Sequence, residues 1–275
     1  MSGYIETQAA PVQRRRSVSA SIPSWVGSLL LLAIFLAGWE AYVRWFEVSR
    51  FLLPPPSTVM DAWVRSLGST TIWVHTWVTV QETALGFVFA AVAGVGLGVI
   101  LGKSPRLEKM LNPFIVATQV VPKVALVPLF VVWFGFGLTP KVVIAAILAF
   151  FPILVNTVLG VKSVDPGHRE VLITLNASRW QTLTQLELPS ALPYVLTGME
   201  MGVVLSIIGA VVGEYLGGNV GLGNLAVKEM NSFNTTALFA IIVHLSILGF
   251  IFYAVIVGCR RFAIPWHESV KKNKD

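Results

Sequence analysis

Long apolar stretches alternate with short polar segments along this chain. Six of the stretches predict membrane-spanning helices, because about 20 apolar residues of helix cross a bilayer and lipid requires the backbone to satisfy its own polar groups. The predicted spans are residues 25–42, 82–101, 112–136, 139–161, 192–215 and 236–259. The pattern therefore predicts an all-α membrane protein with a transmembrane domain over residues 25–262.

The polar ends of the chain, residues 1–24 and 263–275, are predicted to be cytoplasmic tails. A run of three arginines precedes the first apolar stretch, as it also would in a cleaved signal peptide, but the stretch is about long enough to span a bilayer. If the N-terminus lies inside, fourteen of the 20 Lys and Arg residues fall on the inner side and five on the outer side. Because inner loops of membrane proteins carry the excess of positive charge, this distribution predicts an N-in, C-in topology.

Composition agrees with the pattern. Hydrophobic residues make up 55% of the chain and charged residues 12%, about half the charged fraction of a soluble domain. The net charge of +6 does not indicate a nucleic-acid partner, because the basic residues are scattered between apolar segments. The single cysteine, Cys259, excludes an internal disulfide.

One polar interruption, residues 165–189, has a distinct pattern of helix signals. Asp165 stands before a proline and predicts a helix start, and Asn176 predicts the left-handed residue that ends this helix. Ser178 and Gln181 form a capping box that starts a second short helix, which Pro189 is expected to end. The interruption therefore predicts two short helices joined by a tight turn.

The spacing of Glu170, Asn176, Leu186, Leu188 and Pro189 resembles the EAA loop of type I ATP-binding-cassette importer permeases. That loop reads Glu-Ala-Ala, three residues, Gly, nine residues, Ile, one residue, Leu-Pro; here Val and Leu replace the two alanines and Asn replaces the glycine. The stretches PKVALVPLFVVWFGFGLTPK, FFPILVNT and ALPYVLTG resemble the nitrate, taurine, alkanesulfonate and thiamine-precursor branch, and the likeness covers roughly residues 53–265. The candidate residues for coupling to an ATPase are Glu170, Val171, Leu172, Asn176, Ala177, Ser178, Trp180, Leu186, Leu188 and Pro189.

The resemblance implies a permease that forms the translocation pathway and is not itself an enzyme. It implies a separate ATPase subunit that holds ATP and Mg, an extracytoplasmic solute-binding protein, a permease homodimer and a surround of membrane lipid, with no cofactor on this chain. The implied solute is a small organic molecule or anion, and the wording of the third and fourth spans favours a heterocyclic vitamin precursor. The alternative function is an ion-coupled secondary transporter, which usually needs intramembrane charges and inverted repeats.

Two readings of the coupling residues stay open. A carboxylate at Glu170 is favoured by the dipole of a short helix, and the resemblance adds a role in fixing the loop against the ATPase or against Arg179. Trp180 and Leu183 share one helix face, which would rest on lipid headgroups or dock in a partner groove. The motif favours docking.

Ionisable residues inside spans are rare, so Lys123, Glu200, Glu214 and His244 are candidates for lining or gating a pathway. Lys123 follows a proline, where the helix is expected to break, and it would snorkel to the inner interface or face an aqueous cavity. Glu214 is expected to meet headgroups at the outer end of its span. For His244, packing or a hydrogen bond in the interior is favoured over a substrate role, and Glu200 has no account at this level.

The glycine patterns and the motif-like runs do not indicate a catalytic or binding site. A stripe of small residues at 86, 90, 94, 98 and 102 predicts close helix packing, with pore lining or a dimer contact as the alternative. Residues 102–104 resemble the tail of a phosphate-binding loop but lack its earlier glycine, and the glycines at 217–223 read as a flexible outer turn. The four histidines are far apart in sequence, and no metal cluster is predicted.

Overall fold

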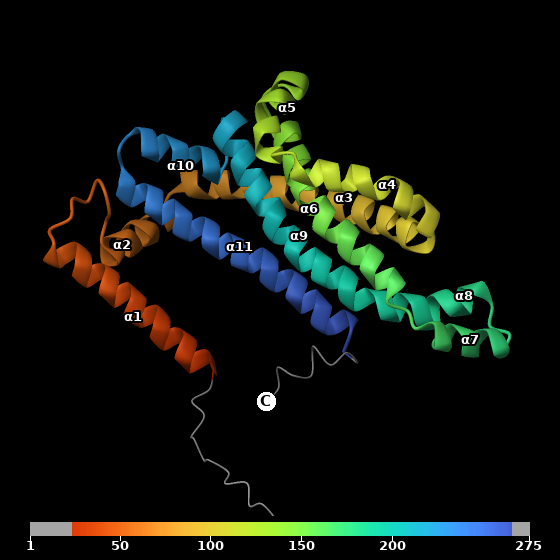
Figure 1. Ribbon diagram of the computed structural model, residues 1–275. Helices are drawn as coiled ribbons and strands as arrows, with labels where there is room; N and C mark the ends of the chain where they lie inside the picture. Colours follow the sequence, from red (N-terminus) through yellow and green to blue (C-terminus); the bar gives the residue numbers. More distant parts are fainter. Residues whose placement is uncertain (1–23, 266–275) are drawn as a thin grey trace, which may run out of the picture.

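The computed structural model describes residues 24–265, and all regular elements in that range are helical. Five helices are long and apolar enough to cross a membrane, the fourth of them counted together with the short helices that precede it (Figure 1). They are α1 (Ser24–Trp45), α3 (Thr70–Lys103), α6 (Leu138–Lys162), α9 (Leu188–Gly217) and α11 (Thr235–Ala263). Of the predicted tails, only residue 24 and residues 263–265 lie within the described part of the chain.

The shorter elements connect these helices. They are α2 (Pro56–Leu67), α4 (Pro105–Val120), the 3₁₀ turn η1 (Lys123–Leu126), α5 (Val127–Phe134), α7 (Pro166–Thr174), α8 (Arg179–Thr182), the π-helical turn η2 (Leu183–Glu187) and α10 (Leu222–Asn231). The sequence pattern predicted α7 and α8, but it did not predict α2 or α10.

The predicted third span, residues 112–136, is a broken helix and not a straight one. α4 ends at Val120, and the η1–α5 segment leaves it at an angle of 79°. Pro122 at the break has no backbone N–H and disfavours helical geometry in the residue before it, as the sequence suggested. Counting this bent pair as one span brings the number of candidate spans to six.

The prediction for the second span, residues 82–101, was too short at its N-terminal end. α3 begins at Thr70, and its extra turns, residues 70–81, carry His75 and Thr79, both buried. Because these polar side chains form hydrogen bonds inside the protein, the helix can extend through this segment. The sequence there is too polar to predict a membrane span.

The prediction that Pro189 ends the second coupling helix was wrong, and the fifth span begins before residue 192. α8 runs through η2 directly into α9, so residues 179–217 form one continuous helix. The π turn directly before Pro189 leaves the normal α-helical bonding pattern where the proline N–H is missing, and a proline is tolerated at such a point.

α6 lies between α3 and α9 and makes the tightest packing in the described structure (Figure 1). The small-residue stripe of α3 faces α6: a Cβ at Gly86 would lie 2.5 Å from the Cβ of Ala145, and one at Gly94 would lie 2.9 Å from Ile153. Gly209 of α9 approaches Ala145 from the other side. The stripe therefore packs helices within one chain, which confirms the favoured interpretation.

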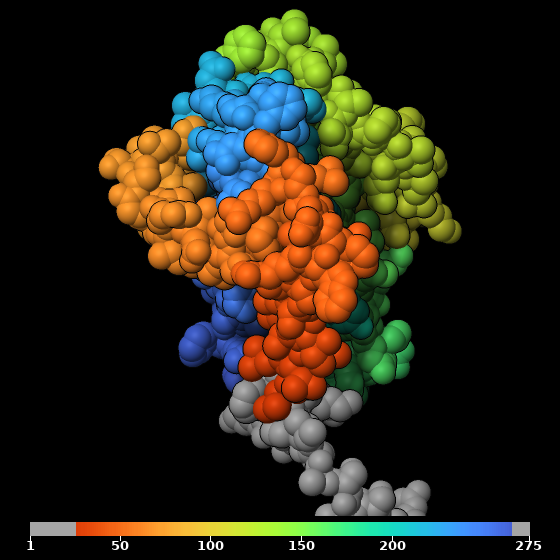
Figure 2. All heavy atoms as spheres, turned by 90° about the vertical axis from the view of Figure 1, so that its left-hand side faces the viewer, coloured from red at the N-terminus to blue at the C-terminus, as the bar shows by residue number. Residues whose placement is uncertain are grey.

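By contrast, α1 forms an outer layer with few contacts, and Figure 2 shows it in front of the other helices. Its Trp39 ring lies 5.8 Å from the ring of Phe239 in α11. Glu40 of α1 accepts hydrogen bonds from Ser57 and forms an ion pair with Arg44. The leucines of α1 stay exposed and are available to lipid or to another protein.

Gly98→Ala is expected to lower the melting temperature of the purified protein. Its Cβ would lie 2.5 Å from the Cβ of Thr157 in α6, and overpacking of this kind costs about 1–3 kcal/mol. The control is Gly96→Ala on the same helix, where a Cβ meets nothing within 4 Å, and where alanine should stabilise the helix by up to ~1 kcal/mol. Equal melting temperatures for the two variants would contradict close packing at Gly98.

Candidate functional site

The helix pair of residues 165–189, the coupling loop, folds as its capping signals predict. The Asp165 carboxylate accepts a hydrogen bond from the Gly167 backbone N–H at 2.7 Å and caps α7. Asn176 has a φ of 55°, the left-handed conformation expected where α7 ends. Ser178 and Gln181 then close a complete capping box, which starts α8.

The coupling loop exposes apolar side chains that nothing in the described structure covers. Trp180 is 71% exposed, and Val171, Ile173, Leu175 and Leu188 are exposed as well. Single exposed apolar residues are common, but a group of them on one short segment marks an interaction surface. The loop can therefore receive a protein partner or a membrane surface.

Ion pairs hold the coupling loop to the transmembrane helices. Glu187 in η2 pairs with Arg169 of α7 at 2.9 Å and with Lys103 at the end of α3 at 2.8 Å. Glu170 is exposed, and in residues 24–265 no ion pair joins it to Arg179, so its other expected role, fixing the loop against the ATPase, stays a prediction. Glu187 is the residue that anchors the loop, and the family motif did not predict this role.

The remaining coupling candidates occupy the same loop. Glu170, Asn176 and Ser178 are exposed, whereas four others are half-buried. The half-buried ones are Leu172, Ala177, Leu186 and Pro189.

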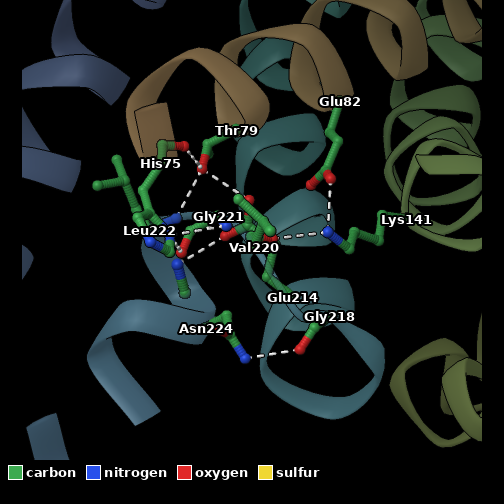
Figure 3. A network of polar contacts seen from close by, with 11 residues as sticks. His75, Thr79, Glu82, Lys141, Glu214, Gly218, Val220, Gly221, Leu222 and Asn224 are labelled. Carbon is green, nitrogen blue, oxygen red and sulfur yellow. Dashed lines mark hydrogen bonds and ion pairs between the residues drawn. The ribbon is translucent and has the colours of Figure 1, made fainter. Parts of the chain in front are cut away.

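A buried polar network lies at the other end of α9 and was not predicted (Figure 3). Lys141 of α6 forms an ion pair with Glu82 of α3 at 2.7 Å and also donates to the Val220 carbonyl at 2.8 Å. Glu82 is 0% and Lys141 4% exposed, although Lys141 is one of the five basic residues that the topology prediction assigned to the outer side. A charge pair in such surroundings is tolerated because each group is bonded to the other.

Glu214 is the second carboxylate of the network. The sequence predicted that it meets headgroups, but it is fully buried inside the protein. The Thr79 hydroxyl donates to Oε1 of Glu214 at 2.6 Å and the Gly223 backbone N–H donates to its Oε2 at 2.6 Å. The Nδ1 atom of His75 lies 3.0 Å from the backbone nitrogen of Gly221. The network thus ties the segment between α9 and α10 to α3.

The glycine-rich segment at 217–223 is therefore an ordered part of the network and not a flexible turn. Gly221 has a φ of 125°, which favours glycine, and a Cβ at Gly223 would lie 2.8 Å from the Glu214 carboxylate. The charges at 82, 141 and 214 are far apart in sequence, so only their presence in apolar stretches could have signalled the network.

The structure separates the other intramembrane candidates. Glu200 pairs with Arg260 of α11 at 2.9 Å, which accounts for its place in α9. His244 is buried, with its Nε2 3.0 Å from the Thr76 hydroxyl, as the interior interpretation expected. Lys123 is half-buried beside a cavity, with its Nζ 4.8 Å from the centre of the Phe151 ring. In the described chain these residues do not converge with Glu214 on one site, and no group of three or more metal-ligating side chains is present.

The sequence matches the family described as "Binding-protein-dependent transport system inner membrane component" over residues 94–259. The chain belongs to this family. The match includes the coupling loop, α9 and most of the helix packing described above.

Relatives of this permease are similar over nearly their full length. It is 34% identical to the formylaminopyrimidine transport permease protein ThiX of Halalkalibacterium halodurans, over 93% of this chain and 99% of the relative. It is 36% identical to the riboflavin transport system permease protein RibX of Chloroflexus aurantiacus, over 88% and 89%. In fold it resembles an inward-facing structure of the MetNI methionine ABC transporter, with a TM-score of 0.61, 20% identity, and coverage of 70% of this chain and 98% of that chain.

Family membership fixes the class of the protein. It is a multi-pass inner-membrane permease of an ABC transporter and not an enzyme, with ATP hydrolysis on a partner chain and a solute-binding protein as a further partner. This finding sets aside the ion-coupled secondary transporter.

Lys141→Met is expected to destabilise the permease strongly, because it leaves the Glu82 carboxylate buried without its counter-ion. Breaking one side of a buried pair costs about 3–5 kcal/mol. Adding Glu82→Gln removes the orphaned charge and should recover much of the loss. The control is Lys162→Met, which breaks a more exposed pair with Glu108 and should cost no more than ~1 kcal/mol. Thermal unfolding of the three variants in detergent checks this order, and equal losses for Lys141→Met and Lys162→Met would contradict it.

Proposed function

We propose that the coupling loop binds the ATPase subunit and that two copies of this permease form the pathway for a planar heterocyclic solute. The observation that carries the proposal is the exposed apolar surface of the loop on a segment anchored to the transmembrane helices. ATP and Mg are held by the ATPase, and this chain contributes no cofactor site.

Docking of the loop on a protein is favoured over a resting place on headgroups. Trp180 and Leu175 project from two short helices whose ends are fixed by caps and by the ion pairs of Glu187. A surface held in a fixed shape suits a groove of matching shape, and apolar helix faces commonly dock in such grooves. The continuous helix from α8 into α9 passes any displacement of the loop to the membrane core.

The loop side of the molecule is proposed to face the cytoplasm. α1 begins and α11 ends toward the end of the molecule where α7 and α8 lie, whereas α10 lies toward the opposite end (Figure 1). The excess of Lys and Arg in the segments on the loop side supports this orientation. The opposite end, with α10 and the buried network, then receives the solute-binding protein.

The solute is proposed to be heterocyclic. The permeases named for formylaminopyrimidine and riboflavin are 34% and 36% identical to this chain, whereas one named for taurine is 30% identical. The first two names share a planar nitrogen heterocycle, and taurine is a small sulfonate. The order of identities supports the heterocyclic class.

The exposed apolar surface of the single chain is the reason for proposing a homodimer. Side chains along α1, α4 and α5 are exposed in the single chain, including Phe114, Val132 and Trp133. A second copy and the surrounding lipid together would cover this surface, since water does not solvate it favourably.

Trp180→Ser is expected to weaken retention of the ATPase about tenfold or more and to abolish most ATP-driven uptake. The side chain is an exposed aromatic anchor, and such residues carry a large share of interface energy. The control is Trp45→Ser, because Trp45 is 84% exposed but ends α1, far from the loop. Co-purification and uptake in proteoliposomes measure both effects. Normal retention of the ATPase by Trp180→Ser would refute docking through this face.

A cysteine at Gln185 in a Cys259→Ser background should react with a membrane-impermeant maleimide only from the cytoplasmic side. Gln185 is exposed in η2, and Cys259 is the only native thiol. A cysteine at Asn219, in the segment between α9 and α10, is the control and should react only from outside. The reverse pattern would overturn the orientation.

A further inference from the structure

A cavity of about 580 Å³ lies where the broken span meets α3 and α6. Phe89 and Ala93 of α3 form one wall, and Phe150 and Phe151 of α6 form another. Lys123 and Thr118 lie at the break in the third span. The volume falls within the range of about 300–1,000 Å³ that is usual for small-molecule sites.

Among the described residues, Lys123 is the one charged side chain that lines this cavity. Its Nζ lies 4.8 Å from the centre of the Phe151 ring, and its hydrogen bond to the Gln119 carbonyl is long at 3.3 Å. Within the described residues no carboxylate forms an ion pair with it. An ammonium carries three N–H donors, so Lys123 has donors left for a ligand.

The aromatic wall supplies a second, independent requirement. The rings of Phe150 and Phe151 both line the cavity, with their centres 5.1 Å apart and their planes at 80° to each other. A flat ring can stack on an aromatic side chain, and such stacking is worth enough to select planar ligands. A small sulfonate has no flat surface to gain from this wall.

We infer that this cavity is a solute subsite, in which a planar nitrogen heterocycle stacks on the Phe150–Phe151 wall and accepts a hydrogen bond from Lys123. The inference rests on the proposed function and adds the residues that recognise the solute. Lys123 belongs to a four-residue 3₁₀ turn between two helices at 79°, so rearrangement of the break would move the donor relative to the wall. Binding at a broken span would thereby link solute position to helix movement.

The test uses the reconstituted permease, ATPase and solute-binding protein in proteoliposomes, with labelled formylaminopyrimidine as the probe. Phe151→Leu and Lys123→Gln are each expected to lower ATP-driven uptake about tenfold, whereas Phe151→Tyr keeps the ring and should stay within about twofold of wild type. Phe250→Leu and Lys109→Gln, changes of the same kind outside the cavity, are the controls. Retained ATPase in each purified complex shows that the variants assemble.

The outcomes separate the two proposals. If the wild-type complex takes up neither formylaminopyrimidine nor taurine when ATP is supplied, the proposed function is overturned. Wild-type uptake of formylaminopyrimidine with unchanged Phe151→Leu and Lys123→Gln variants overturns the subsite alone. A loss in Lys123→Gln but not in Phe151→Leu, together with taurine uptake, overturns the heterocyclic ligand in favour of an anion.

A labelling measurement covers the case in which Phe151→Leu does not assemble. A cysteine at Thr118 in the Cys259→Ser background lies in the cavity, and its reaction with a maleimide during turnover should slow at least about threefold when formylaminopyrimidine is present. An unchanged rate, or equal slowing by added phospholipid alone, contradicts a solute site there.

Discussion

The structure depends on the close approach of helix backbones around α6. In lipid the hydrophobic effect does not draw helices together, so van der Waals packing has to do so, and small residues allow the necessary contact. Ala145 of α6 meets Gly86 from α3 and Gly209 from α9, and Ile153 is enclosed in the same way by Gly94 and Gly202. Three helices thereby form one rigid unit, on which the coupling loop and the buried network are mounted.

The two polar regions of the permease lie at opposite ends of this unit and differ in how far water reaches their charged groups. At one end, Glu187 holds the coupling loop with charge pairs that remain partly open to water. At the other end, Glu82, Lys141 and Glu214 are buried. Their ion pair and hydrogen bonds join α3, α6 and α9, so the segment between α9 and α10 is fixed to α3 and α6. The cavity beside Lys123 lies at neither end but at the break of the third span, where the backbone is least regular.

Much of the architecture could be read from the sequence because its signals are local. Caps at Asp165 and Ser178, the left-handed Asn176 and the small-residue stripe each depend on neighbours a few residues away, and the structure agrees with all of them. Span limits were less certain, since polar turns at the start of α3 are stabilised by partners more than a hundred residues distant, such as Glu214 with Thr79. The coupling candidates stay predictions of function, and the pairing of Glu82 with Lys141 could not be foreseen without the fold.

The continuity of the helix through Pro189 has a mechanical meaning. The 39 residues from 179 to 217 form one continuous helix, with a length of about 58 Å at the usual rise per residue. A tilt of roughly 5° at the loop would carry its far end by about 5 Å, more than the width of a water molecule. If the loop moves as proposed, a tilt of this one helix would displace Glu214, whose buried carboxylate lies near the other end of α9.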